Sequence, residues 1–123
     1  MANPNQVTGN AKIRIDGASM PVAEKSTVLT PGGVSRTEVK GDYEVGNFMA
    51  GNEASKLEFG ALTKSSFDPI AFGKIDDATV HIEFDNGSAY VIRHAWAEKA
   101  PDANTSDGKA SCVMYGQPAE RVR

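Results

Sequence analysis

Apolar and polar residues alternate in several short segments of the chain, and this alternation predicts strands. In AKIRID (11–16) every second residue is apolar, as expected for a strand that buries one face. Turn residues separate this segment from others of similar length. The other segments for which we predict strands are 19–22, 26–30, 34–40, 56–62, 79–84, 88–97 and 109–115. Many short strands with frequent turns are typical of a small antiparallel β-sandwich or barrel.

The segment from 75 to 97, IDDATVHIEFDNGSAYVIRHAWA, contains two apolar-rich runs around a turn sequence and predicts a β-hairpin. A two-residue turn at Asn86-Gly87 would mix apolar and polar side chains on both faces. A three-residue loop, 85–87, with Gly87 in the left-handed conformation, separates them and places Phe84 opposite Ser88. The pattern therefore predicts the three-residue loop. One face then carries Val80, Ile82, Phe84, Tyr90, Ile92 and Trp96, and the other carries Thr79, His81, Glu83, Arg93 and Ala95.

One short helix is expected over 67–72. The serines at 65–66 are suited to cap its N-terminus, and Asp68 would lie in its first turn, where the helix dipole favours a negative charge. Gly73 would end the helix.

Between the expected strands lies GDYEVGNFMAGNEAS (41–55), which is rich in glycine and asparagine and predicts a long loop. Apolar side chains in such a loop either fold back on their own domain or meet a partner. The sequence leaves both possibilities open. The apolar residues concerned are Tyr43, Val45, Phe48 and Met49.

Length and composition indicate one domain. The chain has 123 residues, of which 40% are apolar and 24% charged. We expect a single domain over 11–116, a flexible polar arm at 1–10 and a charged tail at 117–123. Because the N-terminus lacks an apolar core and no run approaches the length of a membrane span, we expect no signal peptide, no membrane contact and assembly in the cytoplasm.

The sequence offers little catalytic or metal-binding chemistry. A net charge of −3 argues against a protein that grips nucleic-acid phosphates. His81 and His94 fall on opposite faces of the predicted hairpin, and they lack a third ligand. Cys112 alternates with apolar neighbours, which predicts a small buried residue and not a nucleophile. We therefore expect no catalytic residue, no metal site and no cofactor.

Four motifs, taken in order, carry a resemblance to a known family. They are KIRIDG (12–17), PGGVSRTEVKG (31–41), DATVHIEFDNGSAYVIRHAWA (77–97) and SDGKASCVMYGQPAE (106–120). In this order, and with a glycine-rich loop between the second and the third, the chain resembles the tail tube proteins of contractile-tailed, Mu-like bacteriophages. The resemblance covers most of the chain from Lys12 to Glu120.

The resemblance implies a small β-sandwich with one short helix, of which six copies form a ring. Inner strands of all subunits would join into one ring-shaped β-barrel, and stacked rings would form a hollow tube in the virion, assembled in the host cytoplasm. Its partners would be copies of itself, the tail sheath protein, baseplate or initiator proteins, the tail terminator, the tape measure protein, and phage DNA passing through the lumen without sequence-specific binding. The strand pairs expected to build the barrel are 34–40 with 56–62, and 88–97 with 109–115.

On this interpretation the loop residues Tyr43, Val45, Phe48 and Met49 would lie at the subunit or ring interface. Polar strand faces place Glu38, Glu58 and Glu83 as candidates for the lumen, because a negative lumen keeps DNA from adhering. Three alternatives remain: a related bacteriocin or type VI-like secretion tube protein, a free-standing β-barrel binding module that grips a ligand with 41–55, and an enzyme, for which no catalytic constellation is visible.

Overall fold

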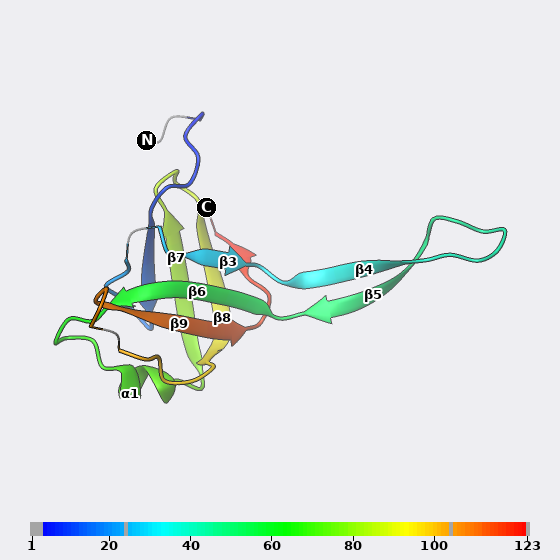
Figure 1. Cartoon of the computed structure of the whole chain (residues 1–123). Coiled ribbons are helices and arrows are strands. Elements are labelled where there is room, and N and C mark those ends of the chain that lie inside the picture. Colours follow the sequence, from blue (N-terminus) through cyan, green and yellow to red (C-terminus); the bar gives the residue numbers. More distant parts are fainter. Residues whose placement is uncertain (1–3, 24, 104, 123) are drawn as a thin grey trace.

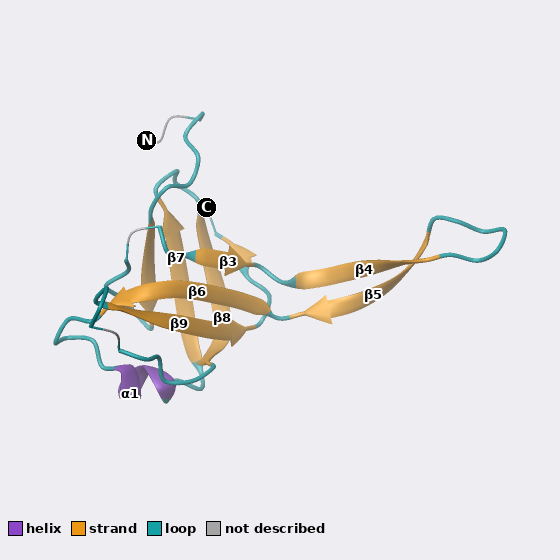
Figure 2. Cartoon of the chain, viewed as in Figure 1, coloured by secondary structure: helices purple, strands orange, loops and turns teal. Residues whose placement is uncertain are grey.

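The computed structural model describes residues 4–23, 25–103 and 105–122, and within them the chain is mainly β with one short helix (Figures 1 and 2). Residues 1–3 of the predicted N-terminal segment and residue 123 of the predicted tail lie outside the described part, as do residues 24 and 104. The elements are β1 (Ala11–Ile15), β2 (Ala18–Ser19), β3 (Val28–Thr30), β4 (Gly33–Val39), β5 (Asn47–Glu53), β6 (Ser55–Leu62), α1 (Pro69–Gly73), β7 (Ala78–Phe84), β8 (Ala89–Ala97), β9 (Lys109–Gly116) and β10 (Glu120–Arg121).

Two antiparallel layers make up the body of the molecule. One follows the order β2-β1-β7-β8, with β10 beside β8, and the other follows β9-β6-β3. They join where the end of β8 pairs with the end of β9, through Trp96 opposite Tyr115 and Ala97 opposite Met114. The path ends at β2 and at β3, which do not pair, so the sheet of the single chain is open.

The inward faces of both layers enclose one apolar core. Every second residue of β6 and β9 is buried, as period-two alternation requires. In Figure 1 the β6–β9 layer crosses the β1–β7–β8 layer steeply, and α1 lies at one end of the body. The core consists of Ile13, Ile15, Leu57, Phe59, Ala61, Phe72, Ala78, Val80, Ile82, Ile92, Ala95, Cys112 and Met114.

The predicted register of the β7–β8 hairpin is confirmed. Phe84 N donates to Ser88 O at 2.9 Å, Gly87 has φ 94°, and Ile82 lies opposite Tyr90. The local turn chemistry and the burial pattern favour the same pairing, so the pattern alone could identify it.

Beyond Ile92, however, the predicted faces are wrong. Val80 pairs with Ile92 but Ala78 pairs with Ala95, so β8 has one extra residue here, and His94 has φ 52°. This β-bulge reverses the side chains that follow it. Ala95 is therefore buried in the core, and Trp96, which was expected in the core, is 44% exposed.

Helix α1 starts later than expected, at Pro69, because Asp68 is extended and is itself the N-cap. Its Oδ1 accepts a hydrogen bond from Ile70 N at 3.0 Å, and Pro69 has no N–H that would need a partner. The serines at 65–66 are not the cap. Gly73 is the last helical residue, and a Cβ there would lie 2.8 Å from the backbone of Ala100. The glycine therefore permits a close approach of the chain.

The prediction of a loop over 41–55 is wrong for most of its length. β5 pairs with all of β4, from Gly33 opposite Glu53 to Val39 opposite Asn47. The two strands form a ribbon that projects from the body, and Figure 1 shows it extending far beyond β3 and β6. We call residues 33–53 the arm. It follows that 34–40 does not pair with 56–62, which lies between β3 and β9 instead.

The segments at the two ends of the described chain contact the body. Gly9 N donates to Asp85 Oδ1 at 2.9 Å, and Asp85 N donates to Asn10 O at 3.1 Å. At the other end, β10 pairs with β8 through Glu120 opposite Val91. The apolar–polar pattern of 117–123 predicts no strand, so β10 is a finding of the structure.

The attachment of residues 6–10 is expected to depend on the charge of Asp85. The hydrogen bond from the Gly9 backbone N–H, followed by the one at Asn10, lowers the pKa of Asp85 below its ordinary 3.8. A lowered pKa means that the contribution of the carboxylate to this attachment is present above pH 3.8 and is lost as the pH falls through the lower value, whereas the hydrogen bond from Asp85 N to Asn10 O does not titrate. In a pH titration by NMR, the Gly9 amide resonance should therefore shift with a midpoint below 3.8.

The control for this titration is Asp85→Asn, which keeps the side-chain shape and a carbonyl acceptor but cannot titrate. Its Gly9 resonance should not show that midpoint. A midpoint at or above 3.8 in the unmodified protein would contradict the prediction.

Candidate assembly surfaces

The arm is exposed along most of its length. Every residue of β5 is exposed, and the four residues singled out from the sequence are among the most exposed apolar side chains of the described chain. Tyr43 (100% exposed) and Val45 (78%) lie at its tip, and Phe48 (59%) and Met49 (61%) lie on β5. Of the two possibilities left open by the sequence, the structure therefore excludes that these side chains fold back on their own domain, and it places them on a ribbon and its tip, and not in one long loop.

The two faces of the arm carry different side chains. Because residues opposite each other share a face, Phe48 lies with Glu38, and Met49 lies with Thr37. On the first face the guanidinium carbon of Arg36 lies 5.5 Å from the centre of the Phe48 ring. Phe48 and Met49 thus point to opposite sides and cannot form one patch, so a partner that covers both must contact both faces.

A two-stranded ribbon with little apolar cover is marginally stable in water by itself. Both outer edges of this ribbon also leave backbone N–H and C=O groups without strand partners, since β4 and β5 form a sheet of their own. The arm thus offers two faces and two edges to another chain.

The three glutamates considered for a lumen lie on three separate surfaces. Glu38 is on the arm, with its carboxylate 3.7 Å from Lys40 Nζ. Glu58 is on the outward face of β6, 2.8 Å from Lys56 Nζ, and Glu83 is on the outward face of β7, 3.8 Å from Arg14 Nη1. Since the layers enclose a common core, Glu58 and Glu83 point away from each other.

The sequence pattern marked Glu58 as the acidic candidate on β6, and the structure brings three further carboxylates close to it on the outward face of the β3–β6–β9 layer. A groove of about 690 Å³ lies between this face and the link from β8 to β9. The hydrogen bond from Lys56 to Glu58 raises the pKa of Lys56. The charged residues that line the groove are four acids and two lysines: Glu58, Glu98, Asp102, Asp107, Lys99 and Lys109.

An aromatic cluster that the sequence pattern did not predict borders the same face. The Trp96 and Tyr115 rings lie 5.1 Å apart, and Lys56 Nζ lies 5.8 Å from the Tyr115 ring centre. The bulge at His94 is what turns Trp96 outward, and no pattern in the sequence marks that bulge. This cluster places a flat apolar surface beside a charged one.

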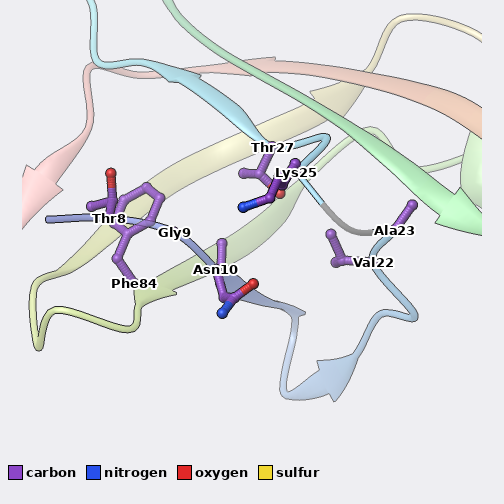
Figure 3. Close-up of a pocket in the computed structure, with 9 residues that line it drawn as sticks. Thr8, Gly9, Asn10, Val22, Ala23, Lys25, Thr27 and Phe84 are labelled. Atoms are coloured by element: carbon purple, nitrogen blue, oxygen red, sulfur yellow. The ribbon is translucent and has the colours of Figure 1, made fainter.

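A small cavity of about 150 Å³ lies at the open side of the sheet, and Figure 3 shows its lining. It is bounded by Thr8 and Asn10 from the N-terminal segment, by Phe84 from β7, and by residues of the link between β2 and β3, namely Val22, Ala23, Lys25 and Thr27. Among the described lining residues Lys25 carries a charge.

Metal-binding and nucleophilic groups do not converge in the described ranges, 4–23, 25–103 and 105–122. No group of three or more His, Cys, Asp or Glu residues there could hold a metal ion. His94 Nδ1 lies 3.0 Å from Asp77 Oδ1, and Cys112 is buried as predicted, which raises the pKa of its thiol to about 11. Among these residues no helix has the length and apolar content needed to cross a bilayer.

Comparison with known proteins identifies the family. The profile of the family described as "Phage tail tube protein" matches residues 4–121. The chain belongs to the phage tail tube protein family. The resemblance found in the sequence is thus confirmed, and this family member is a structural component of a phage tail.

A relative from Haemophilus influenzae (strain ATCC 51907 / DSM 11121 / KW20 / Rd), the Mu-like prophage FluMu tail tube protein, is 31% identical over 118 residues. These cover 96% of this tail tube family member and 98% of the relative.

Two solved structures share the fold. A chain from the cryo-EM structure of the sheath/tube terminator of PVC, an extracellular contractile injection system, in its extended state, has a TM-score of 0.68 at 7% identity, over 92% of this chain and 93% of that one. A chain from the cryo-EM structure of the anti-feeding prophage cap (AFP tube terminating cap) has a TM-score of 0.70 at 8% identity, over 99% and 93%. Both likenesses concern the fold alone.

Proposed function

We propose that this chain assembles into hexameric rings, that the rings stack into the inner tube of a contractile tail, and that phage DNA is delivered through the lumen. Its role would be structural and not enzymatic. The observation that supports this most directly is the arm, a ribbon that exposes apolar side chains on both faces and leaves both edges unpaired. Such a feature is explained by a partner and not by the isolated subunit.

In the tube, Tyr43, Val45, Phe48 and Met49 would contact neighbouring subunits. Burying each of these side chains is worth about 1.5–3 kcal/mol, which would help to offset the cost of ordering a thin ribbon. Because Phe48 and Met49 point to opposite sides, the arm would lie between neighbours and not on the surface of one.

Ring closure would use the open sheet. Strand β3 ends one side of the sheet path and β2 ends the other, so both are available for pairing between subunits. Pairing of this kind would join the six open sheets into one ring-shaped barrel and remove the exposed edges.

Only one of Glu58 and Glu83 can face a common lumen, since they lie on opposite sides of the sandwich. We place the acidic face around Glu58 on the lumen side, where its excess of carboxylates would repel DNA phosphates. The face with Glu83 would then point toward the sheath. Glu38 lies on the arm, so its surroundings in the tube would depend on where the arm lies. The tape measure protein would occupy the lumen before DNA, and baseplate or initiator proteins and the terminator would bind the tube ends during assembly in the host cytoplasm.

The experiment that tests the proposal is negative-stain electron microscopy combined with analytical ultracentrifugation over a range of concentrations. Rings or stacked tubes should appear as the concentration rises, and the sedimentation coefficient should increase with them. A chain that stays monomeric at millimolar concentration, with no rings on the grid, would contradict the proposal.

The lumen assignment predicts a gain of DNA retention on charge reversal. A Glu58→Lys variant adds basic charge to the face assigned to the lumen, so its tubes should hold double-stranded DNA added during assembly and protect it from nuclease. Retention should weaken steeply as salt increases. Glu83→Lys is the matched control on the opposite face. Equal protection of DNA by this control would contradict the assignment of the Glu58 face to the lumen.

A further inference from the structure

The arm is a direct continuation of two body strands. Thr30 lies opposite Lys56 at the end of β3, and Gly33 lies opposite Glu53 at the start of β4. Residues 31–32 therefore face residues 54–55, and the pairing register is the same on both sides of them. β3–β4 and β5–β6 form one ribbon that leaves the body at residues 31–32 and 54–55, which we call the junction.

The junction has a backbone conformation that favours glycine. Gly32 and Gly33 have φ values of 75° and 105°, which L side chains rarely adopt. A Cβ on Gly32 would lie 2.7 Å from Ala54 C and from Glu53 O, so the two strands touch there through their backbones. Since the arm is almost wholly exposed, the body can set its direction at the junction and at the first residues of the arm, where Gly33 and Glu53 border a hollow shared with His94 of β8.

The segment that follows β9 binds both strands of the junction. On one strand, Pro31 O accepts a hydrogen bond from Ala119 N at 2.9 Å. On the other, Ser55 Oγ donates to Gln117 O at 2.7 Å. Ser55 is 0% exposed, so its hydroxyl is committed to this contact and is shielded from water.

The same segment is attached to the body at several points. Gln117 N donates to Arg93 O at 3.2 Å, and Val122 N donates to Ala89 O at 2.9 Å. Arg93 Nε lies 3.3 Å from Glu120 Oε2. Residues 117–122 therefore connect the junction to β8 across the outer surface of the sandwich.

We propose that residues 117–122 act as a bracket that fixes the direction of the arm before assembly, with Ser55 as a positioning residue. This inference rests on the proposed function in one respect, that the arm contacts neighbouring subunits. A subunit whose arm samples several directions has the competent one only part of the time, and its apparent affinity for the growing tube falls by that fraction. The segment expected from the sequence to be a charged tail would thus have a specific mechanical role.

The test is Ser55→Ala, which removes the hydroxyl that holds one strand to the bracket. Spin labels on Ala50→Cys in the arm and His81→Cys in the body report the direction of the arm through their distance distribution, and buried Cys112 should take no label. At a temperature well below unfolding, the distribution should be narrow in the parent and broad in Ser55→Ala. The critical concentration for tube growth should rise about 3- to 10-fold, as expected if a third to a tenth of the arms are competent.

Ser35→Ala is the matched control, because Ser35 Oγ contacts Glu53 Oε1 at 3.2 Å within the exposed arm and not at the junction. It should match the parent in both measurements. If Ser55→Ala unfolds, Ala119→Pro tests the bracket at the other strand, because it removes the N–H that donates to Pro31 O.

Ser55→Ala or Ala119→Pro with a parent-like distance distribution would overturn the bracket. A broadened distribution with unchanged tube growth would overturn its role in assembly. If the parent forms no tubes, the proposed function fails, whereas the distance measurement still decides whether the bracket holds the arm.

Discussion

A chain in which residues 34–52 are replaced by a short Gly-Ser linker is expected to keep its body folded and to lose tube growth completely. Gly33 and Glu53 lie opposite each other, so a short linker can join them without disturbing β3 and β6. No core residue lies in the removed segment. The melting temperature of the body should therefore stay close to that of the parent, and electron microscopy should show no tubes.

A second variant, in which only 41–46 is replaced by Asn-Gly, separates the contributions within the arm. It removes Tyr43 and Val45 but keeps Phe48 and Met49 on the paired ribbon. Partial growth of this variant would assign the main contact to the faces of the ribbon, and no growth would assign it to the tip. If the arm-replaced chain still forms full tubes, the arm is only a connector.

Gly116→Ala is expected to destabilise the body more than other glycine substitutions without positive φ. A Cβ at Gly116 would lie 2.5 Å from Ile92 Cγ2 and 3.1 Å from Ala95 Cα. Ile92 is buried and Ala95 Cα is backbone, so neither can move away without shifting β8 at its bulge. Overpacking of this kind costs about 3 kcal/mol, which for a domain of this size lowers the melting temperature by about 10 °C.

Circular dichroism melts, together with the fluorescence of the single tryptophan, Trp96, measure this effect. Gly41→Ala is the matched control, because its Cβ would meet neighbours only at 3.7–3.8 Å. Melting temperatures that agree within about 2 °C, well under the shift expected for 1 kcal/mol, would contradict the prediction.

The sequence predicted the fold well where two independent local signals agreed. In the β7–β8 hairpin, Gly87 and the alternation of apolar residues both favour a three-residue loop, and that register is the one formed. The bulge at His94 could not be predicted, because a left-handed histidine has no sequence signature and the adjacent contact with Gly116 is distant in the chain. The positions of Ala95 and Trp96 were therefore reversed.

The arm was misjudged for a different physical reason. Strands are recognised from one buried and one exposed face, but both faces of β5 are exposed, so its side chains show no alternation of burial. Gly46 and Gly51 then favoured a loop. Composition left open whether Phe48 and Met49 fold back or stay exposed, and their separation onto two faces depends on the pairing with β4.

The candidate lumen residues show the limit of local patterns. Alternation identified Glu58 and Glu83 as members of polar strand faces, and both are on outward faces. It could not tell that β6 and β7 belong to different layers, because layer membership depends on pairing between distant segments. The acidic groove around Glu58 likewise depends on where the link between β8 and β9 passes.

The single projecting ribbon has a consequence for any filament built with it. Each subunit has one arm that leaves one side of the body, so a contact between an arm and a neighbour is between unlike surfaces. Copies joined in this way all point in the same direction, and the filament is polar. One terminus of such a filament would present free arms and the other unoccupied receiving surfaces, so a factor that starts growth and a factor that stops it would have to recognise chemically different ends.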